Sequence, residues 1–385
     1  MVRRRQMLAS LAGMGTVGLS GCSSDGSGGG TDGDADGGGD DGSDGGSEED
    51  SDTDGADGSD SGTGSDTMSA AWVYVGLIDD LGWTQQHDKG RQHVEEKFDW
   101  LETSFVEEVA EDNSGRVFEE LSQENDLVFG TSFGYMDAML DVSSQHPDVA
   151  YEHCSGVELG ENMGLYYGKM AQARYLVGYA AGLVTETDTV GFSAAFDIPA
   201  VLREMNGFAA GLMASNPDAS ILIRWTNAWF DPQKSQEAAE SLIDEGADVL
   251  AQVQDSPAVV RTARDNGVWG TGSNAPMGEF GDDSYLTTGV WSWGTYYEDV
   301  VKQVRDGAWE PEFSFPGYPD GVVDIDEFGP EVPEDAKSEV RDQEAELEAG
   351  NLDIWEGTKF ADVSPRDQYY EMSELLENFD SDLPS

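Results

Sequence analysis

Trp72-Val-Tyr-Val-Gly-Leu-Ile78 is a continuous apolar run, and the polar turn Asp79-Asp80-Leu-Gly-Trp-Thr84 follows it. An apolar run of this kind is typical of a parallel strand that is buried on both faces. Residues 85–98 then show the apolar spacing of an amphipathic helix. This succession of strand, turn and helix indicates the first unit of an α/β fold.

The same unit recurs along the chain, and its regular alternation predicts a doubly wound α/β fold with parallel sheets. Roughly 300 residues are too many for one core, so we expect two lobes, 68–187 and 188–385. The second should include hinge crossovers near 290–320 and an acidic helical tail. Further strands are predicted at 126–130, 149–153, 189–194, 220–226, 249–254, 268–272 and 285–291, and helices at 134–144, 163–184, 199–215, 232–245, 257–266 and 294–306.

Ligands of such sheets bind beyond the carboxyl ends of the strands, so the strand-to-helix junctions are the candidate sites. Three junctions are alike: Phe196-Asp-Ile-Pro199, Trp229-Phe-Asp-Pro232 and Asp255-Ser-Pro257. Helix capping alone accounts for the Asp, Ser and Pro residues. The aromatic residues are not needed for a turn. We expect Trp83 and Trp229 to face each other from opposite lobes, an arrangement that suits a flat ring.

The N-terminus has the parts of an export signal in their usual order. Arg3-Arg-Arg5 precedes a short apolar stretch and the tetrapeptide Leu19-Ser-Gly-Cys22. This pattern predicts a twin-arginine signal peptide, too short to span a bilayer, with a lipobox in which Cys22 receives a lipid. The alternative is a chance cysteine in a flexible N-terminus. Cys154 then has no disulfide partner and is either a nucleophile or, more in keeping with its type, an inert core residue.

The chain carries a formal charge of −58, from 78 acidic and 20 basic residues. Residues 23–67 contain only Ser, Gly, Asp, Glu, Thr and Ala, which predicts a disordered, acidic linker. This linker holds 15 of the acids, so residues 68–385 still carry −46. Such a charge argues against binding to nucleic acid or to an anionic lipid surface. It predicts a protein of an extreme halophile, an archaeon, or alternatively an acidic partner-binding face.

Several segments of the chain carry a family resemblance. They are Asp80-Leu-Gly-Trp-Thr-Gln-Gln-His-Asp-Lys-Gly-Arg91, Ala173-Arg-Tyr-Leu-Val-Gly-Tyr-Ala-Ala-Gly182, Asp197-Ile-Pro199 with Gly207-Phe-Ala-Ala-Gly211, Asp255-Ser-Pro257 and Trp293-Gly-Thr-Tyr-Tyr297. In this order they resemble the basic membrane protein family of substrate-binding lipoproteins, which serve ABC importers. The resemblance covers roughly residues 70–360. It implies a type I periplasmic-binding fold, whose two lobes close on a ligand, and known members bind purine bases or purine nucleosides.

The resemblance places the two stacking aromatic residues on Trp83 and Trp229, with Thr84 beside the first. Nucleoside-binding members hold the ribose with an acidic residue and a lysine. The corresponding segments here, Gly272-Ser-Asn-Ala-Pro-Met277 and Thr287-Thr-Gly-Val-Trp291, have neither, which favours a free base or another flat, neutral ligand. The predicted ligand-binding residues are Asp80, Trp83, Thr84, His87, Phe133, Tyr135, Phe196, Trp229, Asp255, Asn274 and Trp291.

Some of these residues have a second interpretation that the sequence leaves open. His87 suits a ligand donor and a solvated helix residue equally well, and Phe133 and Tyr135 line the pocket or only pack near it. Trp293 and Tyr297 are expected to pack within a lobe or the hinge.

The predicted function is a monomeric, lipid-anchored receptor on the outer face of the cytoplasmic membrane, which delivers a purine-like solute to an ABC permease and its ATPase. A ligand sensor for a membrane signalling protein is the alternative, followed by a nucleoside hydrolase. No histidine stands in a metal-binding pattern, and no Gly-x-Ser-x-Gly elbow or Walker loop occurs. We therefore expect no catalytic residue, metal or cofactor.

Overall fold

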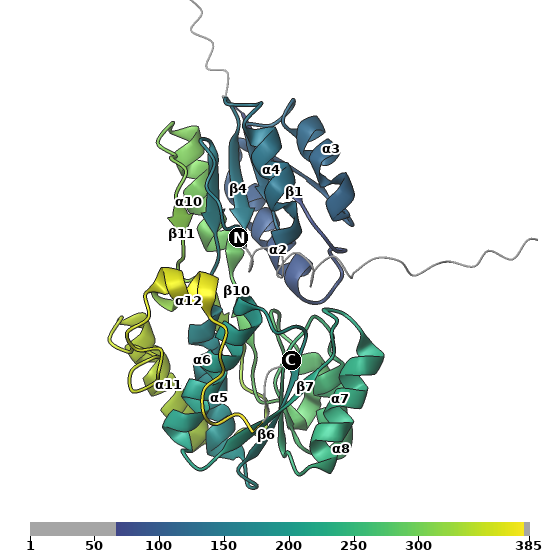
Figure 1. The fold of residues 1–385 in the computed structure, drawn as a ribbon, viewed down its shortest axis with the longest axis vertical. Helices are drawn as coiled ribbons and strands as arrows, with labels where there is room; N and C mark the ends of the chain where they lie inside the picture. The colour runs from purple at the N-terminus through teal and green to yellow at the C-terminus, as the bar shows by residue number, and fades with distance from the viewer. Residues whose placement is uncertain (1–66, 381–385) are drawn as a thin grey trace, which may run out of the picture. The chain divides into compact units, whose positions relative to one another are not determined.

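Two parallel sheets organise residues 67–380, the part of the chain that this computed structural model describes (Figure 1). The export signal, Cys22 and the linker lie outside the described residues. Every neighbouring pair in the first sheet is parallel. Its strands, in spatial order, are β11 (Phe313–Ser314), β5 (Met163–Tyr166), β4 (Ala150–Cys154), β3 (Leu127–Gly130), β1 (Met68–Val73) and β2 (Leu101–Val106).

The second parallel sheet comes from the middle of the chain. Its strands, in spatial order, are β7 (Ser220–Trp225), β6 (Thr189–Ala194), β8 (Val249–Val253) and β9 (Trp269–Gly270). A separate antiparallel pair joins β10 (Gly289–Trp291) to β12 (Val323–Ile325). The α/β class and the parallel sheets predicted from the strand and helix alternation are therefore confirmed.

Helices alternate with these strands. They are α2 (Trp83–Lys97), α3 (Glu111–Leu121), α4 (Met136–Ser143), α5 (Met170–Val184), α6 (Pro199–Ser215), α7 (Pro232–Asp244), α8 (Ala258–Asn266), α9 (Gly278–Gly281), α10 (Trp293–Arg305), α11 (Glu334–Glu348) and α12 (Pro365–Glu371), with short 3₁₀ turns η1 (Phe133–Tyr135), η2 (Asp282–Ser284) and η3 (Tyr318–Asp320). None of the helices within residues 67–380 combines the length and the apolar character that a membrane crossing requires.

The chain passes between the two sheets three times. It leaves the first sheet after β5, returns after β10 to form α10 and β11, and leaves again before β12. Figure 1 shows α10 and β11 beside the strands of the first sheet, although they come from late in the chain. Helix α5 packs mainly on α6, and also on α11, β10 and β12. The division into residues 68–187 and 188–385 stays a prediction.

Three predicted elements differ from the structure. The strand predicted at 72–78 ends at Val73, because its neighbours β2 and β3 end opposite that residue. The helix predicted at 163–184 is wrong in its first part, where β5 pairs with β4 and β11 before the helix begins at Met170. The strand predicted at 285–291 contains pairing only from Gly289 onward, apart from a single bridge at Tyr285.

The close packing of α5 on α6 depends on glycine. A Cβ on Gly178 would lie 1.9 Å from the carbonyl oxygen of Phe208, and one on Gly211 would lie 1.9 Å from that of Tyr175. The two helix backbones therefore touch, and no larger residue fits at these crossings. This packing explains the glycines of the segments 173–182 and 207–211.

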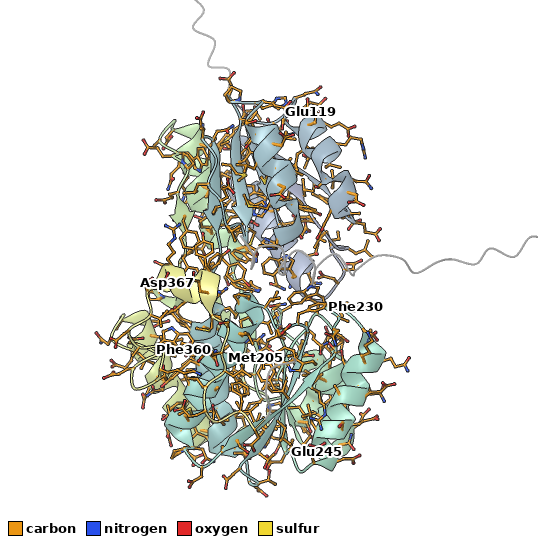
Figure 2. All side chains as sticks on the ribbon, viewed as in Figure 1. Glu119, Met205, Phe230, Glu245, Phe360 and Asp367 are labelled. Atoms are coloured by element: carbon orange, nitrogen blue, oxygen red, sulfur yellow. The ribbon has the colours of Figure 1, made fainter. Side chains whose placement is uncertain are left out.

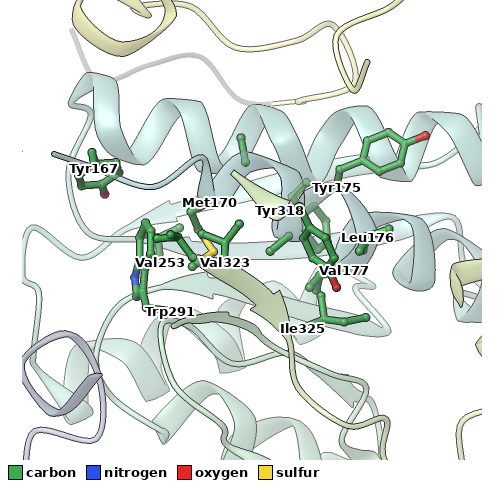
Figure 3. Packing of buried hydrophobic residues seen from close by; sticks show 14 of the residues in the cluster. Tyr167, Met170, Tyr175, Leu176, Val177, Val253, Trp291, Tyr318, Val323 and Ile325 are labelled. Carbon is green, nitrogen blue, oxygen red and sulfur yellow. The ribbon is translucent and has the colours of Figure 1, made fainter. Parts of the chain in front are cut away.

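The largest hydrophobic core continues from this helix pair to β10 and β12. Figure 3 shows Trp291, Val323 and Ile325 of the antiparallel pair facing side chains of α5, including Met170. Gly289 and Trp291 of β10 are buried, whereas Val290 between them is half-buried. This core thus positions part of the site described below.

The charged residues are concentrated on the outer faces of the helices. Helix α7 buries Ala238, Ala239 and Leu242 and exposes Glu237 and Glu240. Figure 2 shows Glu245 and Asp367 pointing outward. These acids lie on solvated helix faces, as an acidic surface requires, whereas Asp88 of α2 and Glu204 of α6 are buried.

Cys154 is a free cysteine in the structure, and it is fully buried. Burial raises the pKa of its thiol far above the usual value, so the thiol stays protonated. An inert core cysteine, the more natural of the two interpretations, is therefore confirmed.

Candidate ligand-binding site

Asp80 fixes the turn between β1 and α2. Its carboxylate accepts hydrogen bonds from the backbone N–H groups of Gly82 at 2.8 Å, Thr84 at 2.8 Å and Gln85 at 3.0 Å. N–H groups at the start of a helix have no partner within it, and the helix dipole favours a negative charge there. Asp80 therefore caps α2 and holds Trp83 at the first helical position.

Trp83 is half-buried, and its indole ring is held on several sides. Its Nε1 donates to the carbonyl oxygen of Thr131, just after β3, at 2.8 Å. The ring lies edge-on to Trp291, with 5.7 Å between centroids, and nearly parallel to Tyr167 at 6.1 Å. These contacts orient the indole without any ligand.

Asp255 follows β8 and contacts the first lobe directly. Its Oδ1 accepts a hydrogen bond from the backbone N–H of Trp83 at 3.1 Å and another from Nδ2 of Asn274 at 2.7 Å. Gly82 is so close that a Cβ on it would lie 2.2 Å from Oδ1. No hydrogen bond from residues 67–380 reaches the other oxygen, Oδ2. The contact thus joins the lobes and leaves Oδ2 without a hydrogen-bond donor among these residues.

Asn274 connects this carboxylate to Trp291. Its backbone is in the left-handed region, with φ 65°, which asparagine tolerates better than most residues. The indole Nε1 of Trp291 donates to Oδ1 of Asn274 at 3.0 Å, and the ring stacks on Trp293 with 4.6 Å between centroids. Asp255, Asn274, Trp291 and Trp83 therefore form one connected group.

Trp229 and Phe196 form a separate aromatic pair at the ends of β7 and β6. Their ring centroids are 5.3 Å apart. The carbonyl oxygen of Trp229 accepts a hydrogen bond from the backbone N–H of Asp255 at 3.0 Å. Within residues 67–380 the rings of Trp83 and Trp229 make no contact with each other, so Asp255 is the residue that bonds to both segments.

His87 lies in the core behind Trp83. It is fully buried, its ring stacks on Trp293 at 4.7 Å, and its Nδ1 is 2.6 Å from the hydroxyl oxygen of Tyr297. Burial lowers its pKa well below the usual value, so the imidazole is neutral. The solvated-helix interpretation is therefore wrong. Trp293 and Tyr297 pack behind the first lobe's helix α2, which confirms their predicted packing role.

The remaining predicted residues lie in three different surroundings. Thr84 is 1% exposed, and its Oγ1 has no hydrogen-bond partner among the described residues. Phe133 is half-buried in η1. Tyr135 is fully buried in a smaller core of the first lobe, together with Val109 and Phe118, and donates to the carbonyl oxygen of Val109 at 2.6 Å. The structure does not bring Tyr135 into the group around Asp255.

A buried ion pair supports the loop that carries Asn274. Arg174 of α5 donates from Nε and Nη2 to the same oxygen of Glu204 in α6, both at 3.1 Å. It also donates to the carbonyl oxygen of Gly272 at 3.0 Å and to Oγ of Ser273 at 2.6 Å. The arginine therefore fixes the two residues that precede Asn274.

Sequence reasoning missed Tyr167 and this ion pair as parts of the site. Tyr167 lies in the crossing segment after β5, inside a predicted helix. Arg174 and Glu204 stand in segments already recognised as motifs, and a charged residue inside an apolar helix such as 170–184 was the signal that pointed to a buried partner.

The carboxyl group of Asp255 should make stability depend on pH. Burial first, and then the charge of Asp80, raise its pKa from 3.8 to about 7. The neutral form therefore stabilises the structure below pH 4, and this stabilisation is lost as the pH rises through 7. This carboxyl group therefore lowers the unfolding temperature of the ligand-free protein between pH 4.5 and pH 8, whereas His87 and His153, whose pKa values burial lowers, raise it over the acidic part of that range.

Asp255→Asn provides the comparison for this measurement, because the amide keeps an acceptor at Oδ1 and does not titrate. Burial also raises the pKa of Glu152 to about 7, so this carboxyl group contributes a similar fall. In molar KCl, Asp255→Asn should gain several degrees of unfolding temperature relative to the wild type between pH 4.5 and pH 8, and Asp255→Asn with Glu152→Gln should gain more. A wild-type pH profile in the double variant would contradict the assignment.

These features define the class of protein: an α/β binding protein whose two lobes meet at a junction lined by aromatic and polar residues. Residues 67–352 match the family of PnrA-like substrate-binding proteins of ABC transporters (Bmp), and the chain belongs to this family. The resemblance noted in the sequence is therefore confirmed. Proteins of this family bind a solute for an ABC transporter and are not enzymes.

Two relatives are similar over most of their length. The chain is 46% identical to a candidate ABC transporter glucose-binding protein (TsgA13) of Haloferax volcanii, over 83% of this chain and 82% of the relative. It is 35% identical to a purine-binding protein of Brucella abortus, over 76% and 84%.

The fold is shared with solved structures. An ABC transporter solute-binding protein of Conexibacter woesei superposes with a TM-score of 0.65 at 23% identity, covering 74% of this chain and 98% of that one. A transcriptional activator of Bacillus halodurans gives 0.66 at 24% identity, covering 74% and 99%. These matches agree with the predicted type I periplasmic-binding fold.

Proposed function

We propose that this substrate-binding protein captures a purine base, or a closely related flat solute, between its two lobes and delivers it to an ABC permease. The observation that carries the proposal is the junction at Asp255. Trp83 of the first lobe and Trp229 of the second are each bonded through their backbone to this residue. Closure at Asp255 therefore brings an indole from each lobe toward the same space.

The polar groups at the junction suit the edge of a heterocyclic base. Oδ2 of Asp255 has no protein donor among residues 67–380 and can accept an N–H of the ligand. The indole N–H of Trp291 is already bonded to Asn274, and the segments 272–277 and 287–291 contain no charged group. The junction thus offers stacking and one acceptor without a ribose clamp, which favours a free base over a nucleoside.

Glucose is the second candidate, because the relative at 46% identity is named for it. A pyranose ring can also pack against an indole, and its hydroxyl groups can donate to Asp255. The two candidates differ in shape and in hydrogen-bond count, since a sugar needs several polar partners around its rim. The relative at 35% identity is named for purine binding. A direct titration separates the two.

The deciding experiment is calorimetric titration of the purified protein in molar KCl. Adenine, guanine, hypoxanthine, adenosine and glucose are added in separate runs. Saturable binding of at least one purine base, tighter than that of adenosine and glucose, supports the proposal. Binding of glucose alone would assign the hexose instead, and tighter binding of adenosine than of any free base would overturn the preference for a base.

The two tryptophans should each contribute to the affinity. Stacking of a base on an aromatic side chain contributes about 1–3 kcal/mol. Trp83→Ala and Trp229→Ala should therefore each weaken purine binding at least tenfold. Trp100→Ala is the matched control, since this half-buried indole packs on Phe98 and Arg305. Unchanged affinity in both site variants, measured by the same titration, would contradict the stacking arrangement.

The location follows from the export signal, which lies outside the described residues. We infer that a twin-arginine signal exports the chain and that a lipid on Cys22 holds it at the outer face of the membrane. Intact-mass measurement of the membrane-bound protein should show the added lipid. Cys22→Ala should release the protein into the medium. A membrane-bound Cys22→Ala protein would contradict this anchor.

A further inference from the structure

A cavity of about 280 Å³ lies between the start of α5, helix α6 and the C-terminal segment 352–368. None of the residues that line it belongs to the candidate ligand-binding site. Its outer wall comes from residues that follow the family match, which ends at residue 352. The cavity is therefore a feature of this chain's C-terminal part, separate from the junction at Asp255.

Arg203 of α6 lines this cavity and is only 2% exposed. Its Nη1 donates to the carbonyl oxygen of Tyr369 at 3.1 Å, while its Nη2 is buried with no hydrogen-bond partner in residues 67–380. Within the same residues, no carboxylate lies at ion-pair distance from it. The other two buried arginines in this range, Arg91 and Arg174, have Asp88 and Glu204 as their partners.

The guanidinium group of Arg203 is thus a buried positive charge without a negatively charged partner in residues 67–380. The guanidinium group stays protonated in proteins, and a buried charge without a counter-ion is costly. The rings of Tyr167, Phe315 and Tyr369 lie 5.0–5.5 Å from the guanidinium carbon and offset part of this cost. They supply no negative charge and leave Nη2 without an acceptor.

The other residues that line the cavity indicate the chemical character of the ligand. Lys169 brings a second positive charge, with its Nζ 5.7 Å from the centroid of Phe315. Asp353 also lines the cavity, but its Oδ1 accepts a hydrogen bond from the backbone of Trp355 at 3.0 Å. Most of the remaining lining residues are apolar, including Phe315, Ile354 and Trp355, and the side chains of Gln172 and Gln368 are bonded to the backbone of Tyr318 and Val363. The occupant should therefore combine one negative group with a small apolar body.

We propose that this cavity is a second small-molecule site, which binds a small organic carboxylate. The carboxylate pairs with the positive charges that Arg203 and Lys169 bring to the cavity wall, and the apolar body packs against Phe315 and Trp355. A volume of about 280 Å³ is at the lower end for ligand pockets, which limits the ligand to metabolite size. The chain's charge of −58 repels anions in general, so binding depends on this local pair of cations.

The test compares carboxylates with their neutral amides. Thermal unfolding and calorimetry of the full chain are measured at constant molar KCl with isobutyrate, benzoate, isobutyramide, benzamide and sulfate. We expect a saturable rise of the unfolding temperature with at least one carboxylate and none with its amide. Equal shifts by a carboxylate and its amide would overturn the proposal, and so would a shift by sulfate as large as that by the carboxylates.

Two variants and a control locate the effect. Arg203→Gln should weaken carboxylate binding at least tenfold. Arg305→Gln is the control, because Arg305 also lies over an aromatic ring, 4.0 Å from the centroid of Trp100, but does not line the cavity. It should leave carboxylate binding unchanged. Ala361→Trp places a large side chain at an exposed position of the cavity lining and keeps Arg203, so it remains informative even if Arg203→Gln does not fold. Undiminished binding in Ala361→Trp or in folded Arg203→Gln contradicts the site.

Discussion

Gly82→Ala should abolish closure of the lobes on the ligand. An added Cβ would lie 2.2 Å from Oδ1 of Asp255 and 2.8 Å from its Cβ, distances that carbon and oxygen atoms do not tolerate. The neighbour is a short side chain that is bonded to Trp83 and Asn274, so it cannot turn away without losing both bonds. We expect the affinity for the ligand identified by titration to fall at least 100-fold, which is about 2.7 kcal/mol.

The same variant has a second readout that needs no ligand. If the lobes cannot meet, Asp255 stays in water and its pKa stays near the usual value. The part of the pH-dependent fall in unfolding temperature that Asp255 causes should therefore disappear in Gly82→Ala. Gly115→Ala is the matched control, because its added Cβ would meet only the Cβ of Ala138, at an ordinary 3.8 Å. Wild-type affinity in Gly82→Ala would exclude the Asp255–Trp83 contact from the bound state.

Arg174→Met should lower the free energy of unfolding by about 3–5 kcal/mol, because it leaves Glu204 as a buried charge without its cation. Both side chains are almost completely buried, with exposures of 0% and 5%. The variant also frees the carbonyl oxygen of Gly272 and the hydroxyl of Ser273, so the loop before Asn274 loses its support. Urea unfolding in molar KCl measures the loss.

Two further variants identify the cause of this loss of stability. Arg174→Met with Glu204→Met removes both charges and should recover much of the stability, since apolar replacements of a buried pair are often neutral. Arg116→Met breaks an exposed pair with Glu120 and should change the free energy by less than about 1 kcal/mol. Equal effects of Arg174→Met and Arg116→Met would show that burial of the pair is not what matters.

Local sequence patterns were sufficient to predict the helices and strands whose ends carry a clear signal, such as a proline or the end of an apolar repeat. Strand β6 and helix α6 occupy the predicted residues, since Pro199 marks the helix start and the apolar period ends at Ser215. Strand β5 was not predicted, because the apolar residues of Met163–Tyr166 fit the spacing of a helix as well as that of a strand. It pairs with β4 on one side and, on the other, with β11, a partner that lies far away in the sequence.

The roles of the aspartates were only partly predictable. Asp231 caps its own helix α7, as the turn pattern predicted, by accepting from the backbone N–H of Lys234 at 3.1 Å. Asp255 has an equivalent place after its strand, yet Ser256 receives the N–H of Ala258 and frees the aspartate to bond across to α2. The two residues differ because only Asp255 faces another lobe, and no local pattern reports that.

The pairing of β5 with β11 also has a consequence for the order of folding during synthesis. The edge strand of the first sheet comes from residues 313–314, which are made after the whole second sheet. The N-terminal lobe therefore cannot complete its sheet cotranslationally as an independent unit, and a ribosome-bound chain that stops before residue 313 should expose the unpaired edge of β5. The two lobes mature together, late in translation, and a chaperone that covers this edge would have most of the synthesis time in which to act.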